Sequence, residues 1–324
     1  MTTRREFVTV LGAGVLAPRI ALAQERVRRV AWFGAGRPDA PSPFYTAFDA
    51  GLKELGWIEN RNLALTQYLS VGSADDALAM ARDMLATNPD LVAAYGRDVI
   101  ALHRAQPKVP VVFAFSGNPV DAGIVQSFSH PGGNMTGISL MSLELAGKRI
   151  ELLKEFVPTI RRLGVLTRPE HAGEPRERAA SEEVARKLGL ALTYAEIRTN
   201  TDLDEAFRTL AQQRIDSLLV FPDGIMVANA PRIHQFALER RIATVSGWSN
   251  FADAGFLLTY GPNLPDSYKY LARYADRVLR GTKPADLPVE LPRTVELVVN
   301  NRTARSLGVK IPNSILVRAT SVIE

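Results

Sequence analysis

Apolar and polar positions alternate in blocks along the first 140 residues, and each block is typical of a strand or a helix. Short apolar runs, such as those at 28–34 and 90–95, predict buried strands. Between them, apolar residues recur at helical spacing, for example over 44–55 and 74–86. The pattern in this half therefore predicts strands separated by helices, including a short helix at 120–128. The strands are expected at 28–34, 62–69, 90–95, 109–115 and 135–140.

The second half repeats this rhythm. Helices are predicted at 143–156, 174–188, 203–213, 224–240, 250–254 and 265–279. Strands are predicted at 162–167, 190–197, 217–221, 243–246 and 256–260. The tail from 284 contains an extended piece interrupted by prolines and then a helix at 301–307.

Strands that alternate with helices of about 10–15 residues predict parallel sheets built from βαβ units. Two such series, divided near 138–142, predict an α/β chain of two doubly wound parallel-sheet lobes joined by a hinge. In such folds ligands bind at the carboxyl ends of the strands, where the strand order reverses. Two facing lobes therefore predict one cleft that closes on a small molecule.

The first 24 residues do not belong to this pattern. Arg4 and Arg5 precede a short apolar run, and the segment ends in Ala21-Leu22-Ala23. A charged start, a short apolar run and an A-x-A site are typical of an export signal, and the run is too short to cross a bilayer. The arginine pair also matches a twin-arginine export address. We expect segment 1–23 to be an export signal peptide, and favour this over a strand or helix of the fold.

Composition narrows the range of functions. Hydrophobic residues make up 46% and charged residues 23% of the chain, which is typical of a folded globular protein. The formal charge is +5, but no run of lysine and arginine is dense enough to predict a nucleic-acid surface. The chain has no cysteine, which excludes disulfides and thiolate chemistry.

Sequence motifs for catalysis, cofactors or metals are absent. Gly34-Ala35-Gly36 follows the first strand, but Asp39 stands where a dinucleotide fingerprint needs its third glycine. The histidines are widely spaced, without an HExxH pair, and neither a phosphate loop nor a GxSxG elbow occurs. We expect no metal, no cofactor and no enzyme activity, although a Ser/His/Asp triad assembled from distant residues stays open.

Polar and aromatic residues follow most of the predicted strands. Each such loop can also be an ordinary turn or helix cap, but together they predict a pocket with apolar walls and a few hydrogen-bonding groups. The loops are Ser42–Tyr45, Gly96–Asp98, Ser116–Pro119, Arg168–Glu170, Pro222–Gly224, Gly247–Asn250 and Tyr260–Asn263.

The whole chain resembles the exported substrate-binding proteins of ABC transporters, in the family similar to tryptophan/tyrosine-type binding proteins. The resemblance is spread over the full length, and no single motif decides it. It is carried by the RREF signal, FDAGLKELGW at 48–57, HPGGNMTGIS at 130–139, KRIELLK at 148–154, VFPDG at 220–224, FADAGFLLTYG at 251–261 and LVVN at 297–300.

This resemblance implies a type I periplasmic-binding-protein fold. It implies an N-terminal lobe of residues 24–138 plus 262–324 and a C-terminal lobe of residues 139–261, with the tail the least certain part. It also implies ligand-facing positions at Phe44, Tyr45, Gly96, Arg97, Asn118, Asp223, Trp248 and Asn263.

Two positions depart from the family pattern. Arg97-Asp98 stands where a small hydroxyl residue or proline is frequent, and Asn118 stands where aspartate is frequent. Arg97 can make a two-pronged contact with a ligand carboxylate, or it can pair with Asp98 or another acidic side chain at the surface, and both alternatives stay open. Asp223 can hold a ligand ammonium or cap the following helix.

The resemblance implies a periplasmic, monomeric capture protein without bound nucleic acid. Its partners would be an ABC permease in the inner membrane and the cytoplasmic ATPase of that transporter. The expected ligand is a small organic solute, amino-acid-like or an aromatic carboxylate, because Tyr45, Trp248 and Tyr260 are candidates for the pocket. The alternatives are an exported enzyme or a ligand sensor on the same fold.

Overall fold

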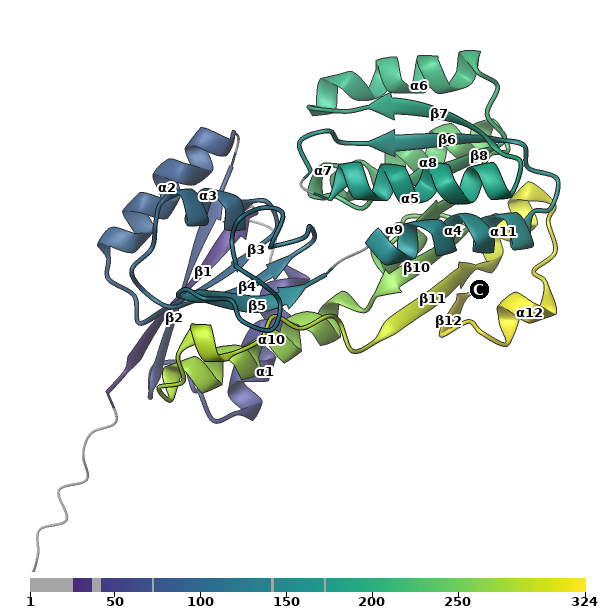
Figure 1. Ribbon diagram of the computed structural model, residues 1–324. Helices are drawn as coiled ribbons and strands as arrows, with labels where there is room; N and C mark the ends of the chain where they lie inside the picture. Colours follow the sequence, from purple (N-terminus) through teal and green to yellow (C-terminus); the bar gives the residue numbers. More distant parts are fainter. Residues whose placement is uncertain (1–25, 37–41, 72, 141–142, 172) are drawn as a thin grey trace, which may run out of the picture.

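A computed structural model describes residues 26–36, 42–71, 73–140, 143–171 and 173–324, and its ribbon divides into two lobes (Figure 1). The predicted export signal at 1–23 lies outside the described residues. Within the described part of the chain, no helix is both long and apolar enough to cross a membrane.

The first lobe contains a five-stranded parallel sheet in the order β2-β1-β3-β4-β5. Helices α1 and α10 pack together on one face of this sheet, and α2 and α3 lie on the other (Figure 1). The strands are β1 (Arg28–Ala35), β2 (Leu63–Ser70), β3 (Leu91–Tyr95), β4 (Val111–Phe115) and β5 (Met135–Ser139). The helices are α1 (Pro43–Glu54), α2 (Ala74–Ala86), α3 (Asp98–Arg104) and α10 (Leu264–Leu279).

The second lobe contains a seven-stranded sheet in the order β12-β11-β10-β9-β8-β6-β7. Its strands are β6 (Arg162–Thr167), β7 (Ala191–Glu196), β8 (Ser217–Val220), β9 (Ala243–Ser246), β10 (Leu258–Pro262), β11 (Val295–Asn300) and β12 (Ser321–Ile323). Its helices are α4 (Leu143–Phe156), α5 (Glu174–Lys187), α6 (Leu203–Gln212), α7 (Gly224–Ala228), α8 (Ala230–Glu239), α9 (Ser249–Asp253), α11 (Asn301–Leu307) and α12 (Asn313–Leu316). Single 3-10 turns, η1 (Asn200–Asp202) and η2 (Pro284–Asp286), complete the elements.

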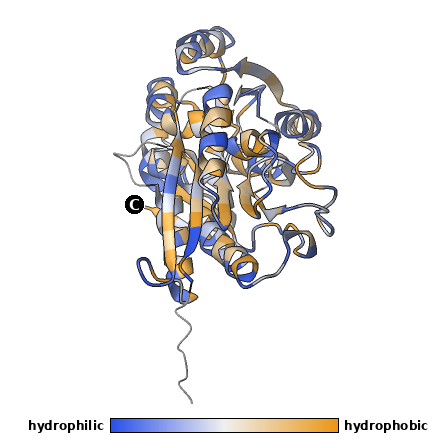
Figure 2. Ribbon diagram, turned by 90° about the vertical axis from the view of Figure 1, so that its left-hand side faces the viewer, coloured by the Kyte–Doolittle hydropathy of each residue, from blue (hydrophilic) through white to orange (hydrophobic). Residues whose placement is uncertain are grey.

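Burial differs between the strands of the first sheet. Every residue of β3, β4 and β5 is buried, as expected for parallel strands covered on both faces. The edge strand β2 is buried only at its two ends. Figure 2 shows hydrophobic and hydrophilic residues mixed along the ribbon of the helices, as in helices that bury only one side.

Local capping fixes several helix starts that the sequence predicts. The Ser73 hydroxyl accepts a hydrogen bond from the Asp76 amide at 3.2 Å, and the Asp76 carboxylate accepts one from the Ser73 amide at 2.7 Å. This reciprocal capping box starts α2 at the predicted position.

The prediction for the tail is wrong in part. Helix α10 and the segment to Glu290 do lie against the first lobe, where Ser139 donates its amide hydrogen to the Glu290 carbonyl at 3.0 Å. Strand β11, however, pairs antiparallel with β10, and β12 pairs with β11 in the second sheet. The prolines before β11 mark the crossing between the lobes, and the buried VELVVN run supplies a strand that strand–helix alternation alone does not predict.

Two helix predictions are also corrected. The predicted helix at 120–128 is a series of turns, because the Asn118 side chain accepts from the Val120 amide at 2.9 Å and Gly123 turns the chain in the left-handed region at φ 71°. The predicted helix at 224–240 is two helices, α7 and α8, which meet at Asn229 just before a proline.

The crossing at the end of β10 depends on a close backbone approach. A Cβ atom added to Gly261 would lie 1.8 Å from the carbonyl oxygen of Gly247. Only glycine therefore lets the end of β10 lie this close to the loop after β9.

We expect Gly261→Ala to destabilise the protein by about 1–3 kcal/mol, because the backbone must shift to admit the methyl group. The matched control is Gly224→Ala, since no atom lies within 4 Å of a Cβ added there. Urea unfolding of both variants measures the difference. Equal midpoints for the two variants would contradict this account of the crossing.

Candidate functional site

The carboxyl ends of the parallel strands in the two sheets face each other (Figure 1). In Figure 1 the arrowhead of β5 points toward the second lobe, and those of β6 and β7 point back toward the first. The strand order reverses between β1 and β3 in the first sheet and between β6 and β8 in the second. Such reversal points are where open α/β sheets bind ligands, so the candidate site comprises the loops at these two points.

Aromatic side chains gather at the reversal point of the first lobe. We call Trp32, Phe44, Tyr45, Tyr95 and Tyr268 the aromatic cluster. The rings of Trp32 and Tyr95 stack at 4.9 Å, those of Phe44 and Tyr268 stack at 4.5 Å, and Tyr45 meets Trp32 edge-on at 5.8 Å. Trp32, Tyr95 and Tyr268 are buried, whereas Phe44 and Tyr45 are half-buried. The last two therefore present the accessible aromatic surface of this cluster.

Ionisable side chains gather at the opposite edge. Arg168, just after β6, pairs with Asp223, just after β8, at 3.3 Å. Glu174, in the first turn of α5, accepts from the Thr167 hydroxyl at 3.2 Å and pairs with Arg178 at 2.7 Å. The second lobe thus presents acidic and basic side chains at its edge of the candidate site, whereas the first lobe presents aromatic rings.

Below these loops lies a fully buried ion pair. Arg149 of α4 and Glu177 of α5 approach to 3.5 Å between Nη1 and Oε1, with side-chain exposures of 0% and 1%. Burial raises the pKa of Glu177 to about 7 and lowers the pKa of Arg149 to about 10, while the opposite charge of the partner limits both shifts. Arg149 also donates from Nε to the Tyr260 carbonyl at 2.8 Å.

Arg149 supports the loops without belonging to their surface. A Cβ added to Gly247 would lie 2.6 Å from Arg149 Nη2 and 2.8 Å from the ring of Pro222. The guanidinium therefore packs beneath the loops that begin at Pro222 and Gly247 and supports their position. Its role in the site is positioning.

The chain matches the model of the ABC transporter substrate binding protein family over residues 39–323. It belongs to this family. It is 23% identical over 265 residues to the tyrosine-binding protein of Clostridioides difficile (strain R20291), a match that covers 81% of this chain and 76% of that protein.

Solved structures share the fold of this family member. A conserved domain protein from Vibrio cholerae O1 biovar El Tor superposes with a TM-score of 0.85 at 26% identity, covering 92% of this chain and 100% of that one. An ABC domain from Streptococcus pneumoniae in complex with L-Trp superposes with a TM-score of 0.84 at 23% identity, with the same coverage. The predicted α/β type I binding-protein fold is thereby confirmed.

Among the predicted site residues, Gly96 and Arg97 lie at the end of β3. Gly96 adopts φ 64°, and no atom lies within 4 Å of a Cβ placed there, so this turn faces open space. Arg97 Nε lies 3.5 Å from Asp98 Oδ1, and one third of its side chain is exposed. Asp98 is buried and accepts from the Ser70 hydroxyl. The pairing of Arg97 with Asp98, one of the two alternatives, is thus present.

Three predicted polar residues cap local structure. Asn118 caps the turn after β4, as described above. Asp223 accepts from the Ile225 amide at 2.7 Å and so starts α7, in addition to its pair with Arg168. Asn263 accepts from the Asp266 amide at 2.9 Å at the start of α10 and donates to Glu296 at 2.8 Å. Asn263 therefore ties two crossings of the chain together.

Trp248 occupies the loop after β9. It is 8% exposed, and its ring lies 6.5 Å from that of Phe251. Among the described residues its buried indole N–H has no hydrogen-bond partner. An unpaired buried donor costs free energy.

Sequence reasoning missed His171, which lies one residue beyond a predicted loop. Its Nδ1 accepts from the Gly173 amide at 3.3 Å, so Nε2 carries the proton and donates to Ser116 Oγ at 2.8 Å. A general base must accept the proton of the hydroxyl instead. This serine–histidine pair is therefore oriented as a structural hydrogen bond, and its contact across the lobes could be found only from the fold.

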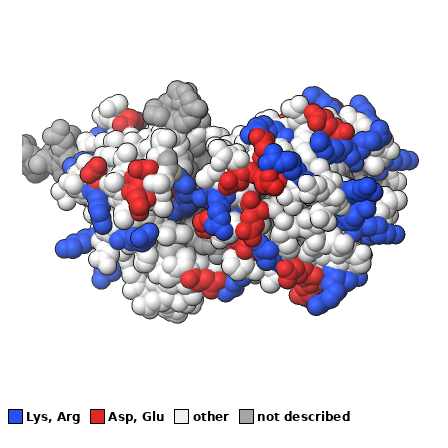
Figure 3. All heavy atoms as spheres, turned by 90° about the horizontal axis from the view of Figure 1, so that it is seen from above, with Lys and Arg blue, Asp and Glu red and all other residues white. Residues whose placement is uncertain are grey.

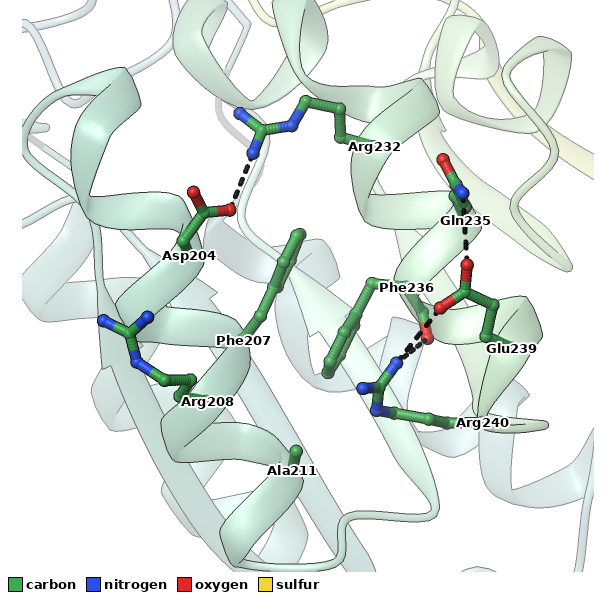
Figure 4. Close-up of a pocket in the computed structure, with 9 residues that line it drawn as sticks. All are labelled: Asp204, Phe207, Arg208, Ala211, Arg232, Gln235, Phe236, Glu239 and Arg240. Carbon is green, nitrogen blue, oxygen red and sulfur yellow. Dashed lines mark hydrogen bonds and ion pairs between the residues drawn. The ribbon is translucent and has the colours of Figure 1, made fainter.

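A separate groove lies between α6 and α8 (Figure 4). Its volume is about 330 Å³, and the rings of Phe207 and Phe236 stack inside it at 4.3 Å. Its polar groups pair with one another, as Arg232 with Asp204 at 2.7 Å and Arg240 with Glu239 at 3.4 Å. The groove does not lie at a strand-order reversal, so the facing loops remain the candidate site for the solute.

We expect Glu177→Gln to change how stability depends on pH. The pKa of Glu177 is raised from 4.5 to about 7 in the folded protein. Its contribution to stability is therefore present below its unfolded pKa and is lost as the pH rises toward 7. The free energy of unfolding of the wild type should fall relative to that of Glu177→Gln over this interval, as urea unfolding at a series of pH values would measure.

The control is Glu183→Gln on the same helix. The pKa of Glu183 is lowered because it accepts a hydrogen bond from Lys187. Its contribution is lost on acidification, so this variant should show the opposite sign. Parallel curves for wild type and Glu177→Gln would contradict the buried-pair account.

Proposed function

We propose that this protein is the exported solute-binding component of an ABC importer and captures an aromatic amino acid or a related aromatic carboxylate between its lobes. It delivers this ligand to a permease in the inner membrane, which a cytoplasmic ATPase drives. It acts as a periplasmic monomer with no catalysis of its own and no nucleic-acid partner. The twin-arginine signal supports export, and family membership supports the transport role.

The observation that carries the ligand class is the aromatic cluster at the first reversal point. Phe44 and Tyr45 are its half-buried members, and ring stacking against them favours a planar apolar group. The relative from C. difficile is a tyrosine-binding protein, and the S. pneumoniae structure holds L-Trp. Both names agree with an aromatic amino acid.

The charged groups of an amino acid need partners of opposite sign. On the first lobe Arg97 has a third of its side chain exposed beside the open turn at Gly96, which suits a ligand carboxylate. On the second lobe Asp223 suits a ligand ammonium, and Trp248, in the loop after β9, offers an indole N–H donor and an apolar wall. We assign Phe44, Tyr45, Gly96, Arg97, Asn118, Asp223, Trp248 and Asn263 to the site, with Asn118 and Asn263 holding its loops.

We expect Phe44→Ala to weaken binding of L-tryptophan at least about ten-fold. The substitution removes an aromatic face whose stacking contributes about 1.5 kcal/mol to the binding free energy. Isothermal titration measures the affinity. The matched control is Phe207→Ala, which removes a stacked ring from the groove between α6 and α8 and should leave the affinity unchanged. Equal losses in both variants, or none in either, would refute the site.

A second test concerns the ligand carboxylate. Wild-type protein should bind L-tryptophan more tightly than L-tryptophanamide, because the amide lacks the negative charge. Arg97→Ala should lose this preference while still binding the amide, if Arg97 contacts the carboxylate. The same preference in wild type and Arg97→Ala would show that Arg97 does not contact the ligand carboxylate.

A further inference from the structure

Among the described residues, two side-chain contacts join the lobes at the facing edges, and neither needs a bound ligand. Arg176, in the first turn of α5, grips Asp121 of the loop after β4 with two contacts of 2.6 Å, Nε to Oδ2 and Nη2 to Oδ1. His171, between β6 and α5, donates to Ser116, the residue after β4, at 2.8 Å. Both contacts link the β4 side of the first lobe to the start of α5 on the second.

The two contacts differ in exposure. The side chains of Arg176 and Asp121 are 54% and 39% exposed, so salt screens their attraction. Seen from above in Figure 3, acidic and basic side chains lie next to one another where the lobes meet. The contact of His171 is half-buried, so salt screens it less.

We propose that Arg176–Asp121 and His171–Ser116 form an interlobe latch, which stabilises the arrangement with the lobes in contact through protein groups alone; we call this arrangement the closed state. The ligand-free protein then populates the closed state to a degree set by salt and pH. The latch rests on the proposed function only in that closure is the event it assists. It acts whichever solute is bound.

Acid should weaken the latch. Burial is the main cause that lowers the pKa of His171; Arg168 lowers it further, and Asp223 and Glu174 oppose this. The Gly173 amide also donates to Nδ1, so a proton there would place two donors face to face. A lowered pKa in the closed state favours closure at neutral pH and disfavours it as the pH falls through the range of an open, solvated histidine.

The experiment measures lobe separation in the ligand-free full-length mature protein. Because the chain has no cysteine, Arg82→Cys on α2 and Gln212→Cys on α6 give one exposed dye position on each lobe. Single-molecule energy transfer between the dyes then reports the compact and extended populations. The ligand plays no part, so failure of the ligand assignment leaves this result interpretable.

Charge reversal tests the ion pair. Arg176→Asp places two carboxylates face to face and should reduce the compact population at least about two-fold at low salt. The double variant Arg176→Asp/Asp121→Arg restores opposite charges and should recover the population, and circular dichroism of both variants checks that each one folds. Arg186→Asp makes the same charge change at an exposed position of the same helix and should have no effect.

Titration tests the histidine. The compact population of the wild type should fall between about pH 7.5 and pH 5.5, whereas His171→Gln keeps an N–H donor without a titrating group and should show a flat profile. A compact population that is unaffected by Arg176→Asp, by salt and by pH would overturn the latch. Loss in Arg176→Asp without recovery in the double variant would also overturn it.

Discussion

The buried pair of Arg149 and Glu177 is the constraint on which the second half of the site depends. Two charges without solvent exposure are expensive to bury, and leaving one of them unpaired costs about 3–5 kcal/mol. The pair joins α4 to α5, and the Nε contact with the Tyr260 carbonyl ties both helices to the end of β10. Helix α4 follows the first crossing of the chain between the lobes, and β10 precedes the second. The Arg149 side chain therefore connects the two crossings.

The glycines of this region follow from the same constraint. Gly247 leaves room for the guanidinium, and Gly261 lets the next strand end against the Gly247 carbonyl. The loops that carry Asp223 and Trp248 therefore pack on a tightly packed layer formed by Arg149, Gly247 and Gly261, and such layers have low compressibility. By contrast, the first lobe positions its half of the site by aromatic stacking, in which Trp32 and Tyr95 support the more exposed Phe44 and Tyr45.

Most helices and strands could be predicted from the sequence, because the spacing of hydrophobic residues indicates which side of an element is buried. Burial of that side stabilises the element in the fold. Strand β6 and helix α4 begin and end where the pattern places them. The failures have physical causes. β11 joins the sheet antiparallel after a long crossing, which βαβ alternation does not anticipate. The resemblance gave Asn118 and Asp223 as ligand-facing positions, and the structure shows that both side chains also cap local structure. The partners Ser116 and His171 are 55 residues apart, so only the fold brings them together.

A latch between the lobes changes what the ligand must supply. If the binding-competent closed state is a small fraction of the free protein, the apparent affinity falls by that fraction. Contacts such as Arg176–Asp121 raise the fraction without contributing to selectivity, because every solute gains equally. Selectivity must then come from the groups that contact the solute, for which we propose the aromatic cluster and the charged side chains opposite it. In this proposal, residues near α5 and β4 stabilise the closed state, whereas residues at the two strand-order reversals recognise the solute. The two sets of residues are different, so either set can vary in sequence without the other.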